Sequence, residues 1–264
     1  MIWWQAAADF RSYLATAGLD SFQALMTAPV GELLDRDKGG RELRRITIPV
    51  HGGSQQLFLR RIGREPLGVL LRMLLFGRIP RCGPLREKMM IDALTAASLP
   101  VMGALAWGEE RRFGLPVRGF LLVEGVQGTD LGHLFATLAP TDRRRELSES
   151  FGAFVARLHG AGFFQPVRLK DVFCVSRPDG YGFTLIDRET SKPWPVRFSR
   201  RRSVNALARA YRRTIRDGHP LSRRDIQAFI RGFLNGLPPA SFSSPKSFRR
   251  LISRAVQREI KTSN

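Results

Sequence analysis

The pattern of apolar residues changes character near Gly128, and this change constrains the fold more than any other feature of the chain. Before it, short segments with β-strand character predominate, among them 42–50 and 55–62 on either side of the hairpin signal "HGGS". After it, apolar residues recur with a helical period, as in 142–159. Strands first and helices later predict an α+β chain with a sheet-rich N-terminal part and a helical C-terminal part.

Further elements follow from the same signals. A helix is predicted over 84–98, with Pro84 in its first turn and Pro100 beyond its end. Thr141 and Asp142 have the composition of a cap for the 142–159 helix. The remaining predictions are strands at 101–111, 117–126 and 181–187, and helices at 203–216, at 222–234 with Ser222 and Asp225 at capping-box spacing, and at 245–260.

The charge balance bounds the partners. There are 43 Lys and Arg residues against 23 Asp and Glu, a net charge of +20, which predicts attraction to nucleic acid, anionic membrane or phosphorylated ligands. Nucleic acid is disfavoured because no recognition motif or interleaved aromatic–basic pattern accompanies the charge. Cys82 and Cys174 are too few for a disulfide framework, and no signal peptide or membrane span is apparent. We therefore expect a cytoplasmic protein.

The segment 66–77, "PLGVLLRMLLFG", has two interpretations. Its apolar middle is accompanied by Arg64, Arg72, Arg78 and Arg81, a composition that suits a helix lying at an anionic membrane surface. It could equally pack on the N-terminal part of the protein. The first interpretation would place the protein peripherally on the inner face of the cytoplasmic membrane.

Seven segments in a fixed order, from about residue 25 to 234, carry a resemblance to a known family. They are "LMTAPVGELLDRDKGGRELRRI", "LFLRR", "LREKMMIDALTAASLPVMGALAWGEERR", "GFLLVEGV", "VARLHGAGFF", "FTLIDRET" and "LSRRDIQAFIRGFL". Their order matches the signature parts of protein kinases, and their residues resemble those of the lipopolysaccharide kinase (Kdo/WaaP) family. The resemblance implies a bilobal protein-kinase-like fold, with a β-rich N-terminal lobe at 1–125 and a helical C-terminal lobe at 126–264.

The resemblance also implies a reaction and its residues. The reaction would be ATP- and Mg²⁺-dependent phosphorylation of a sugar hydroxyl in an anionic cell-envelope glycolipid. Arg60 takes the place of the phosphate-binding Lys, Glu87 that of its helix partner, and Glu124 lies in the lobe linker beside the nucleotide base. Asp187 falls where the family has its metal ligand, and Glu189 is either a second acid near the metal or a solvated neighbour.

The catalytic loop departs from the family pattern. Where members have His-Arg-Asp or His-Pro-Asp, this chain has Gln165, Pro166 and Val167, and Val167 cannot accept a proton. The second metal ligand aligns with Val172, although the adjacent Asp171 could act in its place after a one-residue shift. Two functions therefore stay open: an active kinase that uses Asp171, or a pseudokinase that serves as a binding or regulatory module.

Overall fold

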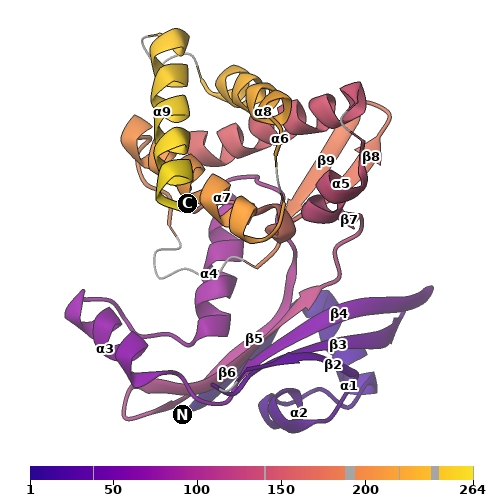
Figure 1. Cartoon of the computed structure of the whole chain (residues 1–264). Coiled ribbons are helices and arrows are strands. Elements are labelled where there is room, and N and C mark those ends of the chain that lie inside the picture. Colours follow the sequence, from indigo (N-terminus) through magenta and orange to yellow (C-terminus); the bar gives the residue numbers. More distant parts are fainter. Residues whose placement is uncertain (38, 140, 188–193, 220, 239–243, 264) are drawn as a thin grey trace. The chain divides into compact units, whose positions relative to one another are not determined.

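The computed structural model describes the chain except for residues 38, 140, 188–193, 220, 239–243 and 264, and Figure 1 shows its elements. The chain divides into two compact units. The N-terminal unit comprises Met1–Ala96, Val101–Val126 and Asp187–Pro193, and the C-terminal unit comprises Ala97–Pro100, Gln127–Ile186 and Trp194–Asn264. Asp187 therefore belongs to the N-terminal unit, although the strand that precedes it belongs to the C-terminal unit.

A six-stranded antiparallel sheet with the order β1-β5-β6-β4-β3-β2 forms the N-terminal unit. Its strands are β1 (Ile2–Ala6), β2 (Glu32–Arg36), β3 (Arg41–Val50), β4 (Gly53–Ile62), β5 (Ala104–Arg112) and β6 (Leu115–Glu124). The strand β4 lies between β3 and β6, so that Arg60 has Leu43 on one side and Leu121 on the other. A residue on β4 is thereby held by hydrogen-bonded strands on both sides.

The two faces of the sheet have different neighbours. Leu57 and Leu59 of β4 belong to a buried apolar cluster with residues of the 3₁₀ helix Ala8–Phe10, α1 (Arg11–Thr16) and α2 (Phe22–Thr27). Successive side chains of a strand point to opposite faces, so Arg60 and Ile62 lie on the other face. Ile62 is buried there against Cys82 and Leu85, at the start of α4 (Gly83–Ala96). A further helix, α3 (Leu67–Leu75), lies between β4 and α4 in the chain.

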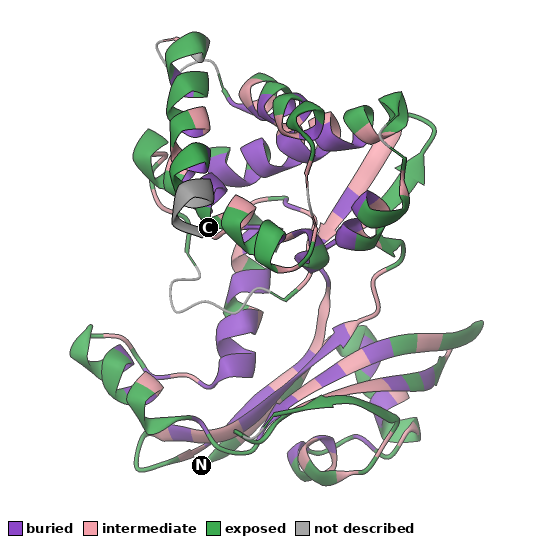
Figure 2. Cartoon of the chain, in the orientation of Figure 1, coloured by how far each residue is buried: buried purple, intermediate pink, exposed green. Residues whose placement is uncertain are grey.

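The C-terminal unit combines helices with a small sheet of the order β7-β8-β9, made of β7 (Thr129–Asp130), β8 (Val172–Arg177) and β9 (Gly180–Leu185). Its helices are α5 (Leu131–Thr137), α6 (Asp142–Gly160), the 3₁₀ helix Leu169–Asp171, α7 (Arg200–Arg216), α8 (Arg223–Gly236) and α9 (Pro245–Ser263). The C-terminal half of α6 is largely buried (Figure 2). Aromatic rings of α6, α8 and β9 contact one another in this core, among them those of Phe151, Phe154, Phe183, Phe229 and Phe233.

The strands and helices predicted from the sequence are present in the structure, with bounds within a few residues. The Ser222–Asp225 capping box is confirmed. The prediction for Thr141 is wrong in part, because it occupies the N-cap position but its hydroxyl donates to the carbonyl of Ala139 instead of capping α6. The strands β1, β2 and β7 and the helices α1, α2 and α5 were not predicted. No helix of the described residues has the length and apolar character needed to cross a membrane.

Candidate functional site

Arg60 is placed by the alternation of β4 and by the helix that covers one face of the sheet. Its neighbour Arg61 points to the opposite face, where Nε donates to the carbonyl of Leu25 at 2.6 Å and Nη2 to that of Ala28 at 2.8 Å. Arg60 points towards α4 and meets Glu87 on the second turn of that helix. Two consecutive arginines thus have different tasks: Arg61 holds the α2 region, and Arg60 enters a charged cluster.

One nitrogen of Arg60 contacts two carboxylates. Nη1 donates to Oε1 and Oε2 of Glu87 at 2.6 and 2.8 Å, and to Oδ1 of Asp187 at 2.8 Å. The side chain of Glu87 is 5% exposed, that of Arg60 21% and that of Asp187 51%. Burial lowers the pKa of Arg60, but the charges and hydrogen bonds of Glu87 and Asp187 outweigh it, and the net shift is upward. The guanidinium therefore stays charged at any working pH.

Asp187 has an unusual backbone conformation. It follows β9 after one intervening residue and has a φ of +53°, in the left-handed region that few residues other than glycine adopt. Asp tolerates this region better than most residues do. Such outliers are frequent at functional sites, and Asp187 is also ion-paired with Arg60 at 2.8 Å. The half-exposed carboxylate is left within reach of a ligand.

A cavity of about 300 Å³ opens beside this cluster, within the N-terminal unit. It is lined by the turn between β2 and β3, by β4, by the first turns of α4 and by Asp187. Five of its lining residues are acidic and three are arginines: Asp35, Asp37, Glu42, Glu87 and Asp187, with Arg41, Arg60 and Arg61. The acidic excess is notable in a chain of net charge +20. A bare polyphosphate would be repelled here more strongly than one that carries a divalent cation, because the cation offsets part of the phosphate charge.

The turn between β2 and β3 is built around Asp37. Its Oδ1 accepts from the backbone N–H of Arg41 at 2.8 Å, and its own backbone N–H donates to the carbonyl of Arg41 at 3.0 Å. Gly40, with a φ of +77°, closes the turn by donating to the carbonyl of Asp37 at 3.2 Å. Sequence reasoning did not assign these residues to the site, although "DRDKGG" between two strands was a signal for a glycine-containing turn.

The residues at this cavity fit a magnesium ion that arrives with its ligand. Among the described residues no three His, Cys, Asp or Glu side chains lie close enough to hold a metal by themselves. Mg²⁺ is often bound by one or two carboxylates together with phosphate oxygens and water. The half-exposed Asp187 supplies one such carboxylate, since its Oδ1 accepts from Arg60, whereas both oxygens of the buried Glu87 do so. Glu189, the second acid considered from the sequence, lies outside the described residues.

Glu124 stands at the end of β6 and is bound to the backbone of a neighbouring segment. Its Oε1 accepts from the N–H of Gly103 at 2.7 Å, and its own N–H donates to the carbonyl of Gly103 at 3.0 Å. Its carboxylate therefore has a structural role at the point where the chain leaves the sheet. A contact with a nucleotide base stays a prediction.

The loop with the altered catalytic motif belongs to the C-terminal unit. Val167, Asp171 and Val172 are all buried, and the side chain of Asp171 is 10% exposed. That carboxylate accepts from Arg168 Nε at 3.1 and 3.3 Å and from Nη2 at 3.1 Å. The position of the family's acid is thus filled by an apolar side chain that packs inside the unit, and the adjacent acid is bound by an arginine.

His159, which precedes the loop, is fully enclosed. Its Nδ1 lies 2.8 Å from Ser203 Oγ on α7, and its ring contacts those of Phe164 and Phe233. Burial lowers its pKa to about 3, so the ring is neutral at physiological pH. These contacts give His159 a supporting role, because a histidine held in this way joins α6 to α7.

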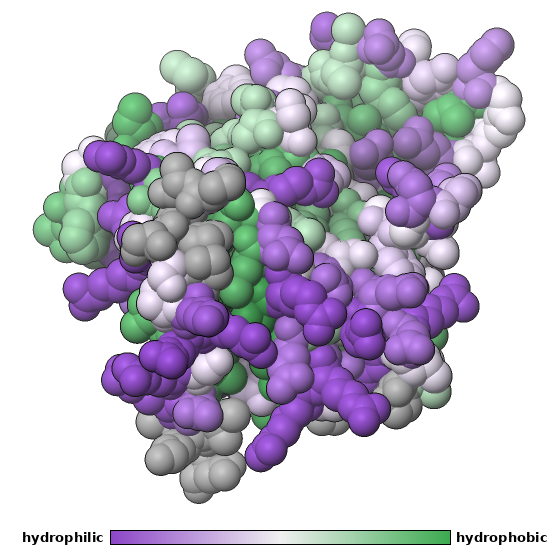
Figure 3. Space-filling model, turned by 90° about the horizontal axis from the view of Figure 1, so that it is seen from above, coloured by the Kyte–Doolittle hydropathy of each residue, from purple (hydrophilic) through white to green (hydrophobic). Residues whose placement is uncertain are grey.

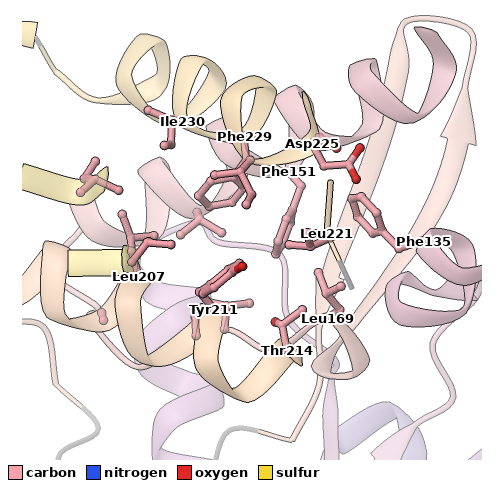
Figure 4. A pocket seen from close by; sticks show the side chains of 18 of the residues that line it. Phe135, Phe151, Leu169, Leu207, Tyr211, Thr214, Leu221, Asp225, Phe229 and Ile230 are labelled. Carbon is pink, nitrogen blue, oxygen red and sulfur yellow. The ribbon is translucent and has the colours of Figure 1, made fainter. Parts of the chain in front are cut away.

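A second cavity, of about 70 Å³, lies inside the C-terminal unit and is almost entirely apolar. Figure 4 shows the rings of Phe135, Phe151, Phe229 and Tyr211 around it. Val167 also lines this cavity. The residue at the position of the family's acid therefore faces an apolar interior.

Comparison with known proteins identifies the family. The sequence model described as "Lipopolysaccharide kinase (Kdo/WaaP) family" matches residues 20–233, which is most of the chain. The chain belongs to this family. The matched range includes Arg60, Glu87 and Asp187 as well as the altered loop. No curated protein matches the chain.

One solved structure confirms the fold. A structure described as "WaaP in complex with acyl carrier protein" is similar with a TM-score of 0.65 and 20% identity over 97% of this chain and 99% of that one. The kinase-like α+β fold predicted from the sequence is thereby shown. A mutant form of the kinase domain of Mycobacterium tuberculosis PknI matches with a TM-score of 0.42 and 16% identity over 86% of this chain and 94% of that one.

Proposed function

We propose that this family member is a phosphotransferase that binds ATP with Mg²⁺ in the charged cavity of the N-terminal unit. The acceptor would be a sugar hydroxyl of a cell-envelope glycolipid, and the place of action the inner face of the cytoplasmic membrane. One observation carries the proposal: Arg60 is bound by Glu87 and Asp187 at once, beside a cavity of about 300 Å³. Family membership supports the class of reaction and of acceptor.

In this proposal each residue has a separate task. Glu87 fixes the guanidinium of Arg60, whose planar fork is suited to phosphate oxygens. Arg60 Nε is buried and has no hydrogen-bond partner among the described residues. Asp187 would hold the magnesium ion, and the ion would neutralise charge that develops on the phosphate groups. Asp171 would orient or deprotonate the acceptor hydroxyl, which requires Arg168 to release its carboxylate.

A pseudokinase is the second candidate, and the loop favours it. Val167 is buried against an apolar cavity, and the carboxylate of Asp171 already has a cationic partner. Phosphoryl transfer depends chiefly on positioning and charge stabilisation, so loss of the acid does not by itself abolish the reaction. A general base contributes roughly 10²–10⁴-fold. The two candidates therefore differ in rate and not in ligand.

Transfer of labelled phosphate from ATP to a purified lipopolysaccharide separates these candidates. We expect Mg²⁺-dependent transfer by the parent, and loss of transfer in Asp187→Asn but not in Asp92→Asn, an exposed aspartate of α4 that pairs with Lys88. A parent that binds nucleotide without transferring phosphate would be a pseudokinase. A parent that does neither would refute the proposal.

Val167→Asp tests whether the missing acid limits the rate. The new carboxylate would face an apolar interior, so we expect a lower melting temperature. At temperatures where the variant is folded, transfer should increase by up to roughly 10²–10⁴-fold if the acid is limiting. Val167→Asn is the matched control, because it adds similar polarity without a base. An equal gain in both variants would show that the acid does not act as a base.

An acyl carrier protein is a second proposed partner, because the similar WaaP structure contains one. The apolar cavity of the C-terminal unit would suit only the end of a carried acyl chain, because its volume is about 70 Å³. Ala210→Phe, which would fill the cavity, should reduce co-purification of the acylated carrier protein. Co-purification of the carrier protein without an acyl chain should be unchanged. Equal capture of both carrier forms by the parent would contradict an acyl site.

A further inference from the structure

The helix α3 has an apolar face that points to solvent. Leu70 and Met73 are buried against the N-terminal unit, whereas the remaining large residues of the helix and its C-terminal extension are exposed. The exposed set consists of Leu67, Leu71, Leu74, Leu75, Phe76 and Ile79, with Leu75 at 85%. Most of the α3 ribbon is accordingly coloured as exposed in Figure 2. Single exposed apolar residues are normal in soluble proteins, but a contiguous set of this size indicates a binding surface.

A second apolar group lies at the same end of the sheet. Phe113, at the turn between β5 and β6, is 104% exposed and has a φ of +50°, in the left-handed region where a bulky residue is rarely found. Glycine or asparagine would suit this turn better. A strained turn that holds an aromatic ring entirely in solvent is typical of a binding site.

Hydrogen bonds join these two features into one surface. The N–H of Glu65, just before α3, donates to the carbonyl of Val117 on β6 at 3.0 Å. After α3, Arg81 pairs with Glu109 of β5 at 2.8 Å, and the side chain of Arg111 donates to the carbonyl of Pro80. Figure 1 shows α3 and the β5–β6 turn at the same end of the unit. We call the exposed residues of α3, Phe76, Ile79 and Phe113 the apolar end.

The charges around the apolar end have one sign. Arg64, Arg72 and Arg112 are exposed beside it. The acids of the region, Glu65, Glu109 and Glu110, are buried and each accepts from an arginine. An apolar helix face rimmed by arginine is complementary to a lipid bilayer with anionic head groups.

We propose that the apolar end is a membrane-docking surface that inserts into the head-group region of an anionic bilayer. The exposed leucines and Phe113 would enter the boundary between head groups and acyl chains, and the arginines would contact lipid phosphates. This inference names the surface that would bring the proposed site to a lipid-linked acceptor. It stands apart from the charged cavity, and its test uses neither nucleotide nor sugar.

The test is co-sedimentation of the full chain with vesicles of phosphatidylcholine alone or mixed with phosphatidylglycerol. We expect the parent to bind the mixed vesicles preferentially. The double variant Leu71→Ser, Leu75→Ser should bind them roughly tenfold to a hundredfold more weakly, because each leucine contributes its apolar transfer energy. Phe113→Ser should weaken binding separately. The matched control is Ile215→Ser with Leu251→Ser, two exposed apolar residues of the C-terminal unit.

Several outcomes would overturn the inference. If the double variant binds as the parent does and high salt releases both, the attraction is diffuse charge alone. If gel filtration shows that the parent is a dimer and the double variant a monomer, a second copy covers the surface.

Melting temperatures identify a variant that fails to fold. Leu75→Ser alone then replaces the double change, because this side chain is almost entirely in solvent.

Discussion

Arg60 gives the N-terminal unit a cation that two carboxylates share. A lysine ammonium is a compact point charge, whereas the guanidinium offers donors in a rigid plane. Nη1 contacts both Glu87 and Asp187, and the buried Nε has no hydrogen-bond partner among the described residues. The exchange of Lys for Arg therefore keeps the charge of the site and changes its geometry.

Removal of this cation should destabilise the protein. In Arg60→Ala the buried Glu87 loses its partner, and we expect a loss of about 3 kcal/mol in the free energy of unfolding. The double variant Arg60→Ala, Glu87→Gln should recover part of this loss, because no buried charge is left unpaired. Arg36→Ala, which breaks an ion pair at an exposed arginine, should cost less than about 1 kcal/mol. Chemical denaturation measures all three, and equal losses in Arg60→Ala and the double variant would contradict the assignment.

His159 should make stability depend on pH. Its pKa is lowered from 6.5 to about 3 in the folded protein, so between these values the unfolded chain binds more protons than the folded chain. Stability should therefore fall as the pH decreases from 6.5 towards 3, with a slope of up to about 1.4 kcal/mol per pH unit from this residue. His159→Gln should lose this contribution, whereas His51→Gln, at an exposed position, should keep it. Parallel stability–pH curves for the parent and His159→Gln would contradict the assignment.

At the scale of elements, α6 and α8 approach so closely that only glycine fits at their contact. A Cβ atom on Gly232 would lie 1.8 Å from the carbonyl oxygen of Glu149, and one on Gly152 would lie 2.1 Å from that of Phe229. Neither backbone can yield without separating the helices. Asp225, at the start of α8, also pairs with Arg144 of α6 at 2.8 Å. This pair of helices therefore holds the core of the C-terminal unit.

Gly232→Ala should consequently lower the free energy of unfolding by about 3 kcal/mol, because overpacking forces a backbone shift. Gly68→Ala on α3 is the matched control. A Cβ there would meet nothing within 4 Å, and alanine is the better helix former by about 1 kcal/mol. Thermal unfolding should therefore show a lower melting temperature for Gly232→Ala and an unchanged or higher one for Gly68→Ala. A tolerated Gly232→Ala would contradict the close approach.

The elements that were predicted correctly are those with a strong local period. The alternation of β4 and the caps of α8 are visible in a few residues, and the structure has both. The missed strands β1 and β2 are the two edges of the sheet, and every residue of β2 is exposed, so no apolar alternation marks it. Edge strands are specified by their neighbours more than by their own pattern.

The candidate site was predictable only in part. That Arg60 faces Glu87 followed from the resemblance, because the pattern of β4 does not say which face α4 covers. The contact of Arg60 with Asp187 spans 127 residues, and the φ of +53° at Asp187 has no local signal. The packing of Val167 into an apolar interior was also unpredicted, since a single valine in a loop does not reveal its neighbours.

At the scale of the whole molecule, the net charge is strongly positive, but the charged cavity has the opposite sign. Hydrophilic side chains crowd one half of the face in Figure 3, and the basic helices α7 and α9 contribute several exposed arginines, such as Arg212 and Arg249. The charged cavity instead has an acidic excess. Long-range attraction would therefore bring anionic partners to the protein, while the cavity itself would select for a bound cation. The expected lobe boundary between residues 125 and 126 stays a prediction.

Thermal unfolding of the full chain with ATP, in the presence and absence of Mg²⁺, tests the central claim most directly. For the parent and for Asp92→Asn we predict that ATP with Mg²⁺ raises the melting temperature by roughly 5–10 °C at about a hundred times the dissociation constant. In Asp187→Asn the Mg²⁺-dependent part of this rise should disappear. An equal rise in Asp187→Asn and the parent would contradict the assignment of Asp187, and no rise in any variant would contradict the nucleotide site.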